Sequence, residues 1–228
     1  MNEWLVRWTQ RFSTRVLLGF LVSVLCLLLF AALAEDVLEQ SRLVQVDMAL
    51  ANDLHQASDA NTIQIYKIIS LFGYQILFPA CAVIALVLAV RRQWLYLTMW
   101  IVALAGGQIL NLLLKTLFAR PRPVFADPFA LEVYYSFPSG HSMISLIAYG
   151  MLAYLIGLHV RNHYARILVV FIAALAIVLI GISRMALGVH YLSDVIGGFI
   201  AGGVWLATCI TAVELRRQTT LPPGVSPL

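Results

Sequence analysis

The sequence predicts an all-α integral membrane protein, built as a bundle of six transmembrane helices. Of its 228 residues, 61% are hydrophobic and only 11% are charged, and the mean hydropathy is +0.89. So few polar residues cannot cover the surface of a soluble globule of this length. Six apolar stretches also reach the roughly 20 residues that a helix needs to cross a hydrocarbon core about 30 Å thick.

The expected spans cover about residues 15–34, 68–90, 95–115, 142–160, 167–187 and 191–213. The connections are mostly short, and no repeat, low-complexity tract or shift in composition divides the chain. We therefore expect residues 1–228 to form a single membrane domain. Gly198 and Gly202 lie four residues apart in the last span, which favours close helix packing or contact with a lipid tail.

The first span has a second interpretation. Ala32-Leu33-Ala34 before Glu35 resembles a signal-peptidase site that follows an apolar run. The leader is long, however, and its apolar run exceeds that of a usual signal peptide, so we favour an uncleaved span. The cysteines at 26, 81 and 209 each lie inside an apolar span without metal-ligand spacing, and they indicate nothing about the redox compartment.

The one extended connection, about residues 35–66, mixes apolar and acidic residues. Its apolar positions are Leu38, Leu43, Val46, Leu50 and Leu54. This mixture predicts a helix lying at the membrane interface between the first and second spans. Because the apolar spacing is imperfect, a disordered acidic loop is the alternative.

Basic residues gather before the first span and then in every second connection and the tail. They are Arg7, Arg11, Arg15, Arg91, Arg92, Arg161, Arg166, Arg216 and Arg217. Most acids lie on the other side: Glu35, Asp36, Glu39, Asp47, Asp53, Asp59, Asp127, Glu132 and Asp194. The positive-inside rule therefore predicts a multi-pass protein of the inner (plasma) membrane with both termini in the cytoplasm. The net charge of +4 reflects this topology, and no basic stripe interleaved with aromatic residues points to nucleic acid.

Polar residues at the ends of the spans all fall at the expected outer face, which is costly unless they have a function there. Lys115 and Arg122 combine a point charge with a planar guanidinium, which suits phosphate binding. Taken alone, they also fit two ordinary interfacial cations. Pro138-Ser139-Gly140-His141 begins the fourth span, where free N–H groups and the helix dipole favour an anion. His141 there suits a general acid, or else an interfacial histidine beside a helix cap.

Arg184 ends the fifth span, and His190 begins the sixth. Asp194 follows His190 by four residues, which places both side chains on one helical face. A carboxylate there can hold one ring nitrogen and orient the other for attack, as in covalent catalysis, although a buried structural contact explains the pair alone. The sequence thus offers three cations, one imidazole suited to act as an acid (His141) and one imidazole paired with a carboxylate (His190 with Asp194). This combination predicts a phosphoryl-transfer site facing the periplasm or cell exterior.

Three segments together resemble the three-part signature of the type 2 phosphatidic acid phosphatase family. They are Lys115 through Pro123, Pro138 through His141 and Ser183 through Asp194. The match covers about 80 residues, and all three parts are complete and in order. The resemblance implies a six-helix core shared with soluble vanadium haloperoxidases, and the apolar spans point to the membrane branch. It also implies that His190 attacks phosphorus to form a phosphohistidine, supported by Asp194, and that His141 protonates the leaving oxygen.

The resemblance further implies that Lys115, Arg122 and Arg184 neutralise the phosphate oxygens, with Ser139 and Gly140 completing the cradle. It implies no metal or other cofactor, and side-chain cations can supply the charge stabilisation that Mg²⁺ gives elsewhere. Arg120 lies outside the signature and is expected to be a second headgroup contact or an ordinary interfacial cation. The histidines at 55, 159 and 163 are expected to be solvated.

We therefore expect an enzyme that hydrolyses a lipid phosphate or diphosphate at the extracytoplasmic face. Undecaprenyl diphosphate, converted to undecaprenyl phosphate, is the favoured substrate because the site faces the side on which that carrier is released. Phosphatidylglycerol phosphate and phosphatidic acid are the alternative substrates. A lipid A phosphatase or phosphotransferase on the same core, and a non-enzymatic lipid-binding or transport protein, are the alternative functions.

Overall fold

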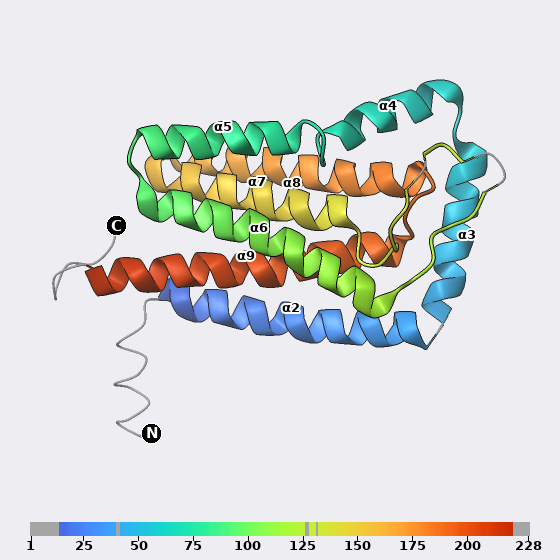
Figure 1. Ribbon diagram of the computed structural model, residues 1–228, viewed down its shortest axis with the longest axis horizontal. Helices are drawn as coiled ribbons and strands as arrows, with labels where there is room; N and C mark the ends of the chain where they lie inside the picture. The colour runs from blue at the N-terminus through green and yellow to red at the C-terminus, as the bar shows by residue number, and fades with distance from the viewer. Residues whose placement is uncertain (1–13, 40–41, 126–127, 131, 221–228) are drawn as a thin grey trace, which may run out of the picture.

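The computed structural model describes residues 14–39, 42–125, 128–130 and 132–220, and all regular structure in them is helical. The helices are α2 (Thr14–Leu38), α3 (Arg42–Ala57), α4 (Ala60–Leu71), α5 (Leu77–Val90), α6 (Trp94–Phe118), α7 (Gly140–His159), α8 (His163–Ala186) and α9 (Leu192–Thr220). The predicted all-α class is thus confirmed for this part of the chain. Figure 1 shows the long helices running along one axis as a bundle, with α3 lying across one end.

In the part of the chain that the structure describes, five helices are long and apolar enough to cross a membrane: Val16–Leu38, Trp94–Phe118, Gly140–His159, His163–Ala186 and Leu192–Arg216. They correspond to five of the six expected spans. The other, residues 68–90, is divided, because α4 ends at Leu71 and α5 begins only at Leu77. Pro79 has no N–H to donate to the carbonyl of Gln75, which disfavours a continuous helix through this point. The number of spans remains a prediction.

The connection expected at 35–66 contains a helix, α3, so a disordered loop is wrong for Arg42–Ala57. One face of α3 is buried, at Asp47 and Ala51, and the neighbouring Val46 and Met48 are exposed. α3 packs against α8 and α9, so it covers the end of the bundle at which α8 ends and α9 begins. Its position at a membrane interface remains a prediction.

α7 is the most buried of the apolar helices and packs against α6, α8 and α9. Its approach to α9 depends on two glycines. A Cβ atom on Gly198 would lie 2.6 Å from the carbonyl oxygen of Ser139, and one on Gly202 would lie 2.9 Å from that of Met143. The helix-packing interpretation of these glycines is confirmed, and the alternative of a lipid-tail contact is wrong.

The two ends of the bundle differ in charge. Arg91 and Arg92 lie between α5 and α6, and Arg161 lies between α7 and α8, at the end opposite α3 (Figure 1). The expected orientation in the membrane, with both termini in the cytoplasm, depends on this separation of basic residues from the other end of the bundle. The orientation itself remains a prediction. Arg7, Arg11 and Asp127, which also entered that expectation, lie outside the described residues.

Candidate active site

Helix ends bring three distant parts of the sequence together beneath α3. Lys115 lies in the last turn of α6 and His141 in the first turn of α7. Arg184 lies in the last turn of α8, and His190 lies two residues before the start of α9. Ala119 ends α6 in the left-handed conformation, with φ 44°, which turns the chain into the loop that carries Arg120 and Arg122.

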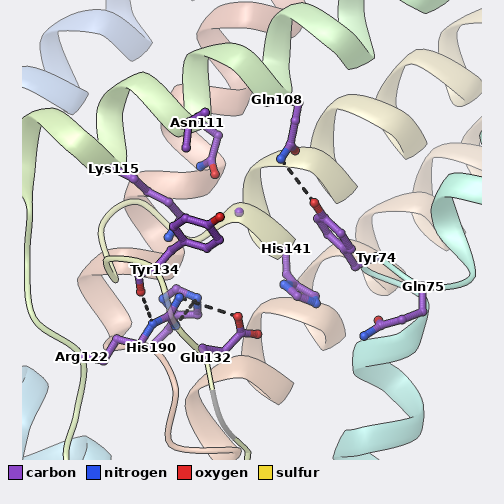
Figure 2. A pocket seen from close by; sticks show the side chains of 12 residues that line it. Tyr74, Gln75, Gln108, Asn111, Lys115, Arg122, Glu132, Tyr134, His141 and His190 are labelled. Carbon is purple, nitrogen blue, oxygen red and sulfur yellow. Dashed lines mark hydrogen bonds and ion pairs between the residues drawn. The ribbon is translucent and has the colours of Figure 1, made fainter.

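A cavity of about 590 Å³ opens among these residues, a size typical of small-molecule sites. Five of the predicted site residues line it: Lys115, Arg122, Gly140, His141 and His190 (Figure 2). The remaining lining residues are Tyr74, Gln75, Gln108, Asn111, Leu112, Glu132 and Tyr134. Within the described residues, no group of three or more His, Cys, Asp or Glu side chains has the arrangement of a metal site.

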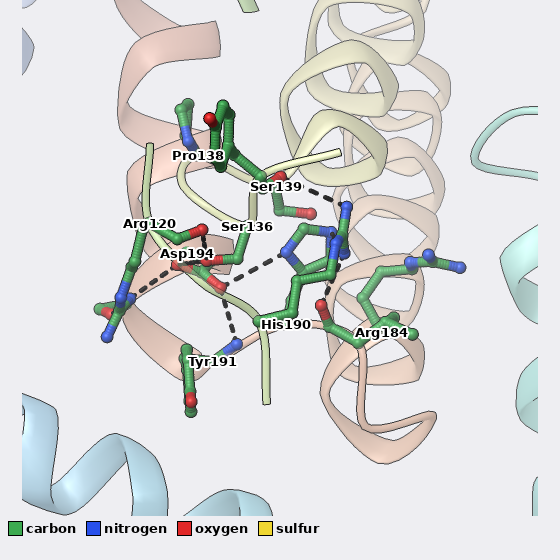
Figure 3. Close-up of polar contacts among 12 residues, drawn as sticks. Arg120, Ser136, Pro138, Ser139, Arg184, His190, Tyr191 and Asp194 are labelled. Atoms are coloured by element: carbon green, nitrogen blue, oxygen red, sulfur yellow. Dashed lines mark hydrogen bonds and ion pairs between the residues drawn. The ribbon is translucent and has the colours of Figure 1, made fainter. Parts of the chain in front are cut away.

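The His190 imidazole is held at both nitrogens. Nδ1 lies 3.4 Å from Asp194 Oδ2 (Figure 3), and Nε2 lies 3.2 Å from Arg122 Nη1. The buried Asp194 carboxylate also accepts a hydrogen bond from the Tyr191 N–H at 2.8 Å. A carboxylate can only accept and a guanidinium can only donate, so the ring proton belongs on Nδ1 and the lone pair on Nε2. Nε2 is therefore the nitrogen available for attack.

His190 is also held neutral. Burial lowers the pKa of the imidazole well below its ordinary value, and the positive charges of Arg122, Lys115 and Arg184 lower this pKa further. A neutral imidazole keeps the lone pair that a nucleophile needs. The same cations that could bind a phosphate thus also keep this imidazole unprotonated.

Lys115 and Arg122 are positioned by main-chain oxygens. Lys115 Nζ donates to the carbonyl of Tyr135. Arg122 donates through Nε to the carbonyl of Tyr134 at 2.5 Å and through Nη1 to that of Val189 at 2.7 Å. These contacts hold both cations beside the cavity without neutralising their charges.

Glu132, to which the sequence analysis gives no role, lies between two arginines. Arg184 Nη2 donates to its Oε1, and Arg122 Nη2 lies 3.9 Å from its Oε2. Arg184 is also fixed by Ser70, whose Oγ accepts from Nη1 at 2.6 Å. The carboxylate therefore occupies a donor of Arg184 that could otherwise bind a phosphate oxygen, and it lies near Arg122 without a hydrogen bond to it.

We expect Glu132→Gln to strengthen inhibition by inorganic phosphate, because a bound phosphate has to displace the Glu132 carboxylate from Arg184. The charge-assisted contact is partly exposed, so the inhibition constant should fall by roughly fivefold. The measurement is the inhibition of lipid dephosphorylation by inorganic phosphate. Asp53→Asn, which removes an exposed charge on α3, is the matched control. An unchanged or higher inhibition constant in Glu132→Gln contradicts the competition.

The start of α7 is a capped helix terminus. The buried Ser139 side chain accepts a hydrogen bond from the Ser142 N–H at 3.4 Å, and it is not among the residues that line the cavity. A phosphate contact by its hydroxyl therefore stays a prediction. Gly140 does line the cavity, and a Cβ atom there would lie 3.0 Å from Asn111 Oδ1.

The His141 side chain points into the cavity from the first turn of α7 (Figure 2). Its ring lies 5.3 Å from the ring of Tyr74, and a Cβ atom on Gly73 would lie only 2.9 Å from its Cδ2. Its Nε2 is buried and has no hydrogen-bond partner among the described residues. A buried polar nitrogen without a protein partner is suited to a proton transfer with a bound substrate.

Arg120 was expected to be a headgroup contact or an ordinary interfacial cation, and both expectations are wrong. Its side chain is buried, with Nη1 2.6 Å from Asp194 Oδ1 (Figure 3). Its Nη2 lies 2.9 Å from Asp47 Oδ2. The guanidinium also lies over the Tyr191 ring, 4.5 Å from its centroid. Burial disfavours the charge, but the two carboxylates outweigh it and raise the pKa of Arg120.

His55 is also not solvated as expected. Its ring stacks between Phe125 and Phe129, with centroid distances of 4.0 and 4.2 Å. Gly188 has φ 71°, and a Cβ atom there would lie 2.9 Å from Phe125 Cε2, so this position needs a glycine on both grounds. The stack thus connects α3 with the loop that leads to His190. His163 is exposed, as expected.

Other lining residues could have been found in the sequence. Gln108 and Asn111 are polar residues inside an apolar span. Gln108 precedes Asn111 by three residues, and Asn111 precedes Lys115 by four. This spacing places all three on one helix face. Tyr74 and Gln75 come from the turn between α4 and α5, where the sequence predicts unbroken helix.

The PAP2 superfamily model matches residues 96–218. Phosphatidylglycerophosphatase B of Bacillus subtilis (strain 168) is 42% identical over 115 residues, which are 49% of this chain and 55% of that protein. The matched segment therefore spans about half the length of this curated relative.

The crystal structure of a transmembrane PAP2 type phosphatidylglycerolphosphate phosphatase from Bacillus subtilis superposes with a TM-score of 0.75 at 31% identity. That match covers 82% of this chain and 94% of the other. Aquifex aeolicus LpxE superposes with a TM-score of 0.58 at 22% identity, over 72% of this chain and 94% of its own, which shows the shared fold alone. The family model covers more than half of the sequence, and the first of these structures is 31% identical over most of both chains. This chain therefore belongs to the PAP2 superfamily.

Proposed function

We propose that this protein removes a phosphate group from a membrane lipid without a metal ion, through a phosphohistidine intermediate. The observation that carries this proposal is the His190 imidazole, with Asp194 3.4 Å from one nitrogen and Arg122 3.2 Å from the other. This arrangement fixes the tautomer, the direction of attack and a cation beside the attacking nitrogen. Membership of a superfamily that includes lipid phosphatases supports the same reaction class.

In the first step His190 Nε2 attacks phosphorus, and the bond between phosphorus and the lipid oxygen breaks. The electron pair of that bond goes to the lipid oxygen, which takes a proton from protonated His141. The positive charge that the His190 ring gains is balanced by Asp194. In the second step water attacks the phosphohistidine, His141 accepts a proton from this water, and the phosphorus–nitrogen bond breaks to release phosphate.

Lys115, Arg122 and Arg184 supply the electrostatic stabilisation in this proposal. Phosphoryl transfer depends mainly on positioning and on neutralising charge at the phosphate oxygens. Fixed cations in a site that is largely shielded from water act without reorganising during the reaction. Arg184 is 4% exposed and Lys115 is 8% exposed, so both are held by the fold in this way.

We place the site at the extracytoplasmic end of a multi-pass inner-membrane domain with both termini in the cytoplasm. Arg91, Arg92 and Arg161 support this orientation, because they lie at the end of the bundle opposite His190. We infer that α4 and α5 together supply the sixth crossing, and that α3 lies at the outer interface above the site. A lipid then keeps its tail in the bilayer and presents its phosphate to the cavity.

Phosphatidylglycerol phosphate is the substrate that the comparisons support best. A curated relative and a solved structure that are similar to this chain are both named for phosphatase activity on this lipid. Undecaprenyl diphosphate is the second candidate, supported by the inferred outward-facing site, because that carrier is released on the outer side. Both lipids present a terminal phosphate monoester or anhydride to the same cations.

The test compares both lipids with the purified protein in one detergent, with EDTA present throughout. We expect phosphate release from phosphatidylglycerol phosphate to persist in EDTA, and kcat/KM for it to exceed that for undecaprenyl diphosphate. The reverse order makes the carrier the preferred substrate. Loss of all activity in EDTA that added Mg²⁺ restores contradicts the metal-independent mechanism. A phosphorylated second lipid indicates a phosphotransferase, and binding without turnover of either lipid indicates a lipid-binding protein.

A further inference from the structure

Asp47 is a wholly buried carboxylate on a helix with an exposed outer face. It lies on α3, outside residues 96–218 that the family model matches, and it is 0% exposed. Burying an ionised carboxylate is costly unless partners compensate its charge. Its contacts therefore show what α3 contributes to the site beneath it.

Asp47 has two partners, which belong to different parts of the site. Its Oδ2 lies 2.9 Å from Arg120 Nη2, and its Oδ1 accepts a hydrogen bond from the Ser193 N–H at 3.0 Å. The Ser193 hydroxyl donates to the same carboxylate. Ser193 directly precedes Asp194, so Asp47 holds the residue next to the proposed partner of His190.

Arg120 completes a chain of contacts to the imidazole. Its Nη1 donates to Asp194 Oδ1 at 2.6 Å (Figure 3) and, as a second contact, to Ser193 Oγ at 2.7 Å. Asp194 then uses its other oxygen, Oδ2, toward His190 Nδ1. Arg120 thus occupies one carboxylate oxygen, and the second accepts from the Tyr191 N–H and faces His190. Arg120 and the Tyr191 N–H together fix the rotation of the Asp194 carboxylate.

We propose that Asp47 is a positioning residue for the nucleophile, acting through Arg120 and Ser193 to orient Asp194 toward His190. This inference rests on the proposed function, because it assigns the network to the step in which His190 attacks phosphorus. It gives α3 a role in catalysis from outside the three sequence motifs. It also explains why Arg120 is buried between two carboxylates rather than exposed to a headgroup.

The charges of the network give this proposal a kinetic signature. Asp47, Arg120 and Asp194 together carry one net negative charge, which balances the positive charge that the His190 ring gains when Nε2 bonds to phosphorus. Asp47→Asn leaves Arg120 and Asp194 as a neutral pair, so this charge is no longer balanced in the transition state. Asp47 does not line the cavity, so the binding of the ground-state substrate is unaffected. The substitution therefore acts on kcat and not on KM.

The test compares Asp47→Asn with Asp53→Asn, which removes an exposed carboxylate from the same helix. We expect kcat for a soluble short-chain phosphatidylglycerol phosphate to fall on the order of tenfold to a hundredfold in Asp47→Asn, as for a small misplacement of a catalytic group. We expect KM to change by less than about twofold and Asp53→Asn to match the wild type. An unchanged kcat, or a rise in KM that accounts for the whole loss, overturns the proposal.

A second readout separates failure of this inference from failure of the proposed function. We expect ¹⁵N NMR of the histidine side chains in detergent to show the Nδ1–H tautomer of His190 in the wild type and a mixture of tautomers in Asp47→Asn. The His190 signals are assigned with His190→Gln. If the wild type hydrolyses no lipid phosphate, the proposed function fails and the tautomer still tests the network. The wild-type tautomer retained in Asp47→Asn overturns the inference.

If Asp47→Asn does not fold, as judged by size-exclusion elution and thermal unfolding, Ser193→Ala takes its place. This substitution removes the hydroxyl shared by Arg120 and Asp47 but keeps the Ser193 N–H contact and both charges. We expect a smaller fall in kcat, about threefold to tenfold, again with KM unchanged. A Ser193→Ala enzyme with wild-type kcat and wild-type His190 tautomer overturns the proposal.

Discussion

His190→Ala is expected to abolish lipid dephosphorylation, with a loss in kcat of roughly 10⁴-fold or more. The imidazole is the one group in the cavity that combines a buried, neutral ring, a carboxylate at Nδ1 and an available Nε2. The cations that we propose to bind the phosphate are unchanged by this substitution, so we expect substrate binding to persist. The measurements are phosphate release and the binding of a short-chain lipid phosphate.

A matched control for this substitution is His163→Ala, because His163 is an exposed histidine at the opposite end of the bundle. We expect the wild type and this control to retain ³²P on the protein after a rapid alkaline quench, since phosphohistidine survives base and is lost in acid. His190→Ala should retain none. Equal labelling of His190→Ala and the wild type places the nucleophile elsewhere.

The second-largest expected effect is that of His141→Ala, which should lower kcat for a lipid substrate by about 10²–10⁴-fold. His141 lies in the cavity, and its Nε2 has no partner within the described residues, so it is free to donate a proton to the leaving oxygen. With p-nitrophenyl phosphate, the leaving group is acidic enough to depart without that proton. We therefore expect a burst of p-nitrophenol in His141→Ala, followed by slow turnover because water is no longer activated.

His159→Ala is the control for this prediction, since His159 ends the same helix far from the cavity. We expect it to behave as the wild type with both substrates. If His141→Ala loses activity equally with the lipid and with p-nitrophenyl phosphate, and shows no burst, then His141 does not act as the acid in the first step. Its role would then be confined to shaping the cavity beside Tyr74.

The sequence was sufficient for the five long apolar helices and for five of the twelve residues that line the cavity. Apolar runs predict five helices that the structure contains, because a membrane span needs only length and hydropathy. It was wrong about the break between α4 and α5, because the segment is mostly apolar and long enough to span, and Gly73 and Pro79 are its only helix-disfavouring residues. It also missed Glu132, because one acid in a mildly acidic loop has no distinguishing pattern.

Local patterns also predicted that His190 and Asp194, four residues apart, would meet, although His190 lies two residues before the start of α9 and not on the helix itself. They could not place Asp47 or Arg120, because their contact joins residues 73 positions apart and depends on how α3 crosses the bundle. Hydropathy and short spacings within the chain therefore determined the class, the spans and the candidate nucleophile. Only the tertiary structure decided which buried charges are paired, because pairing across the bundle is set by helix packing and by the cost of burying an uncompensated charge.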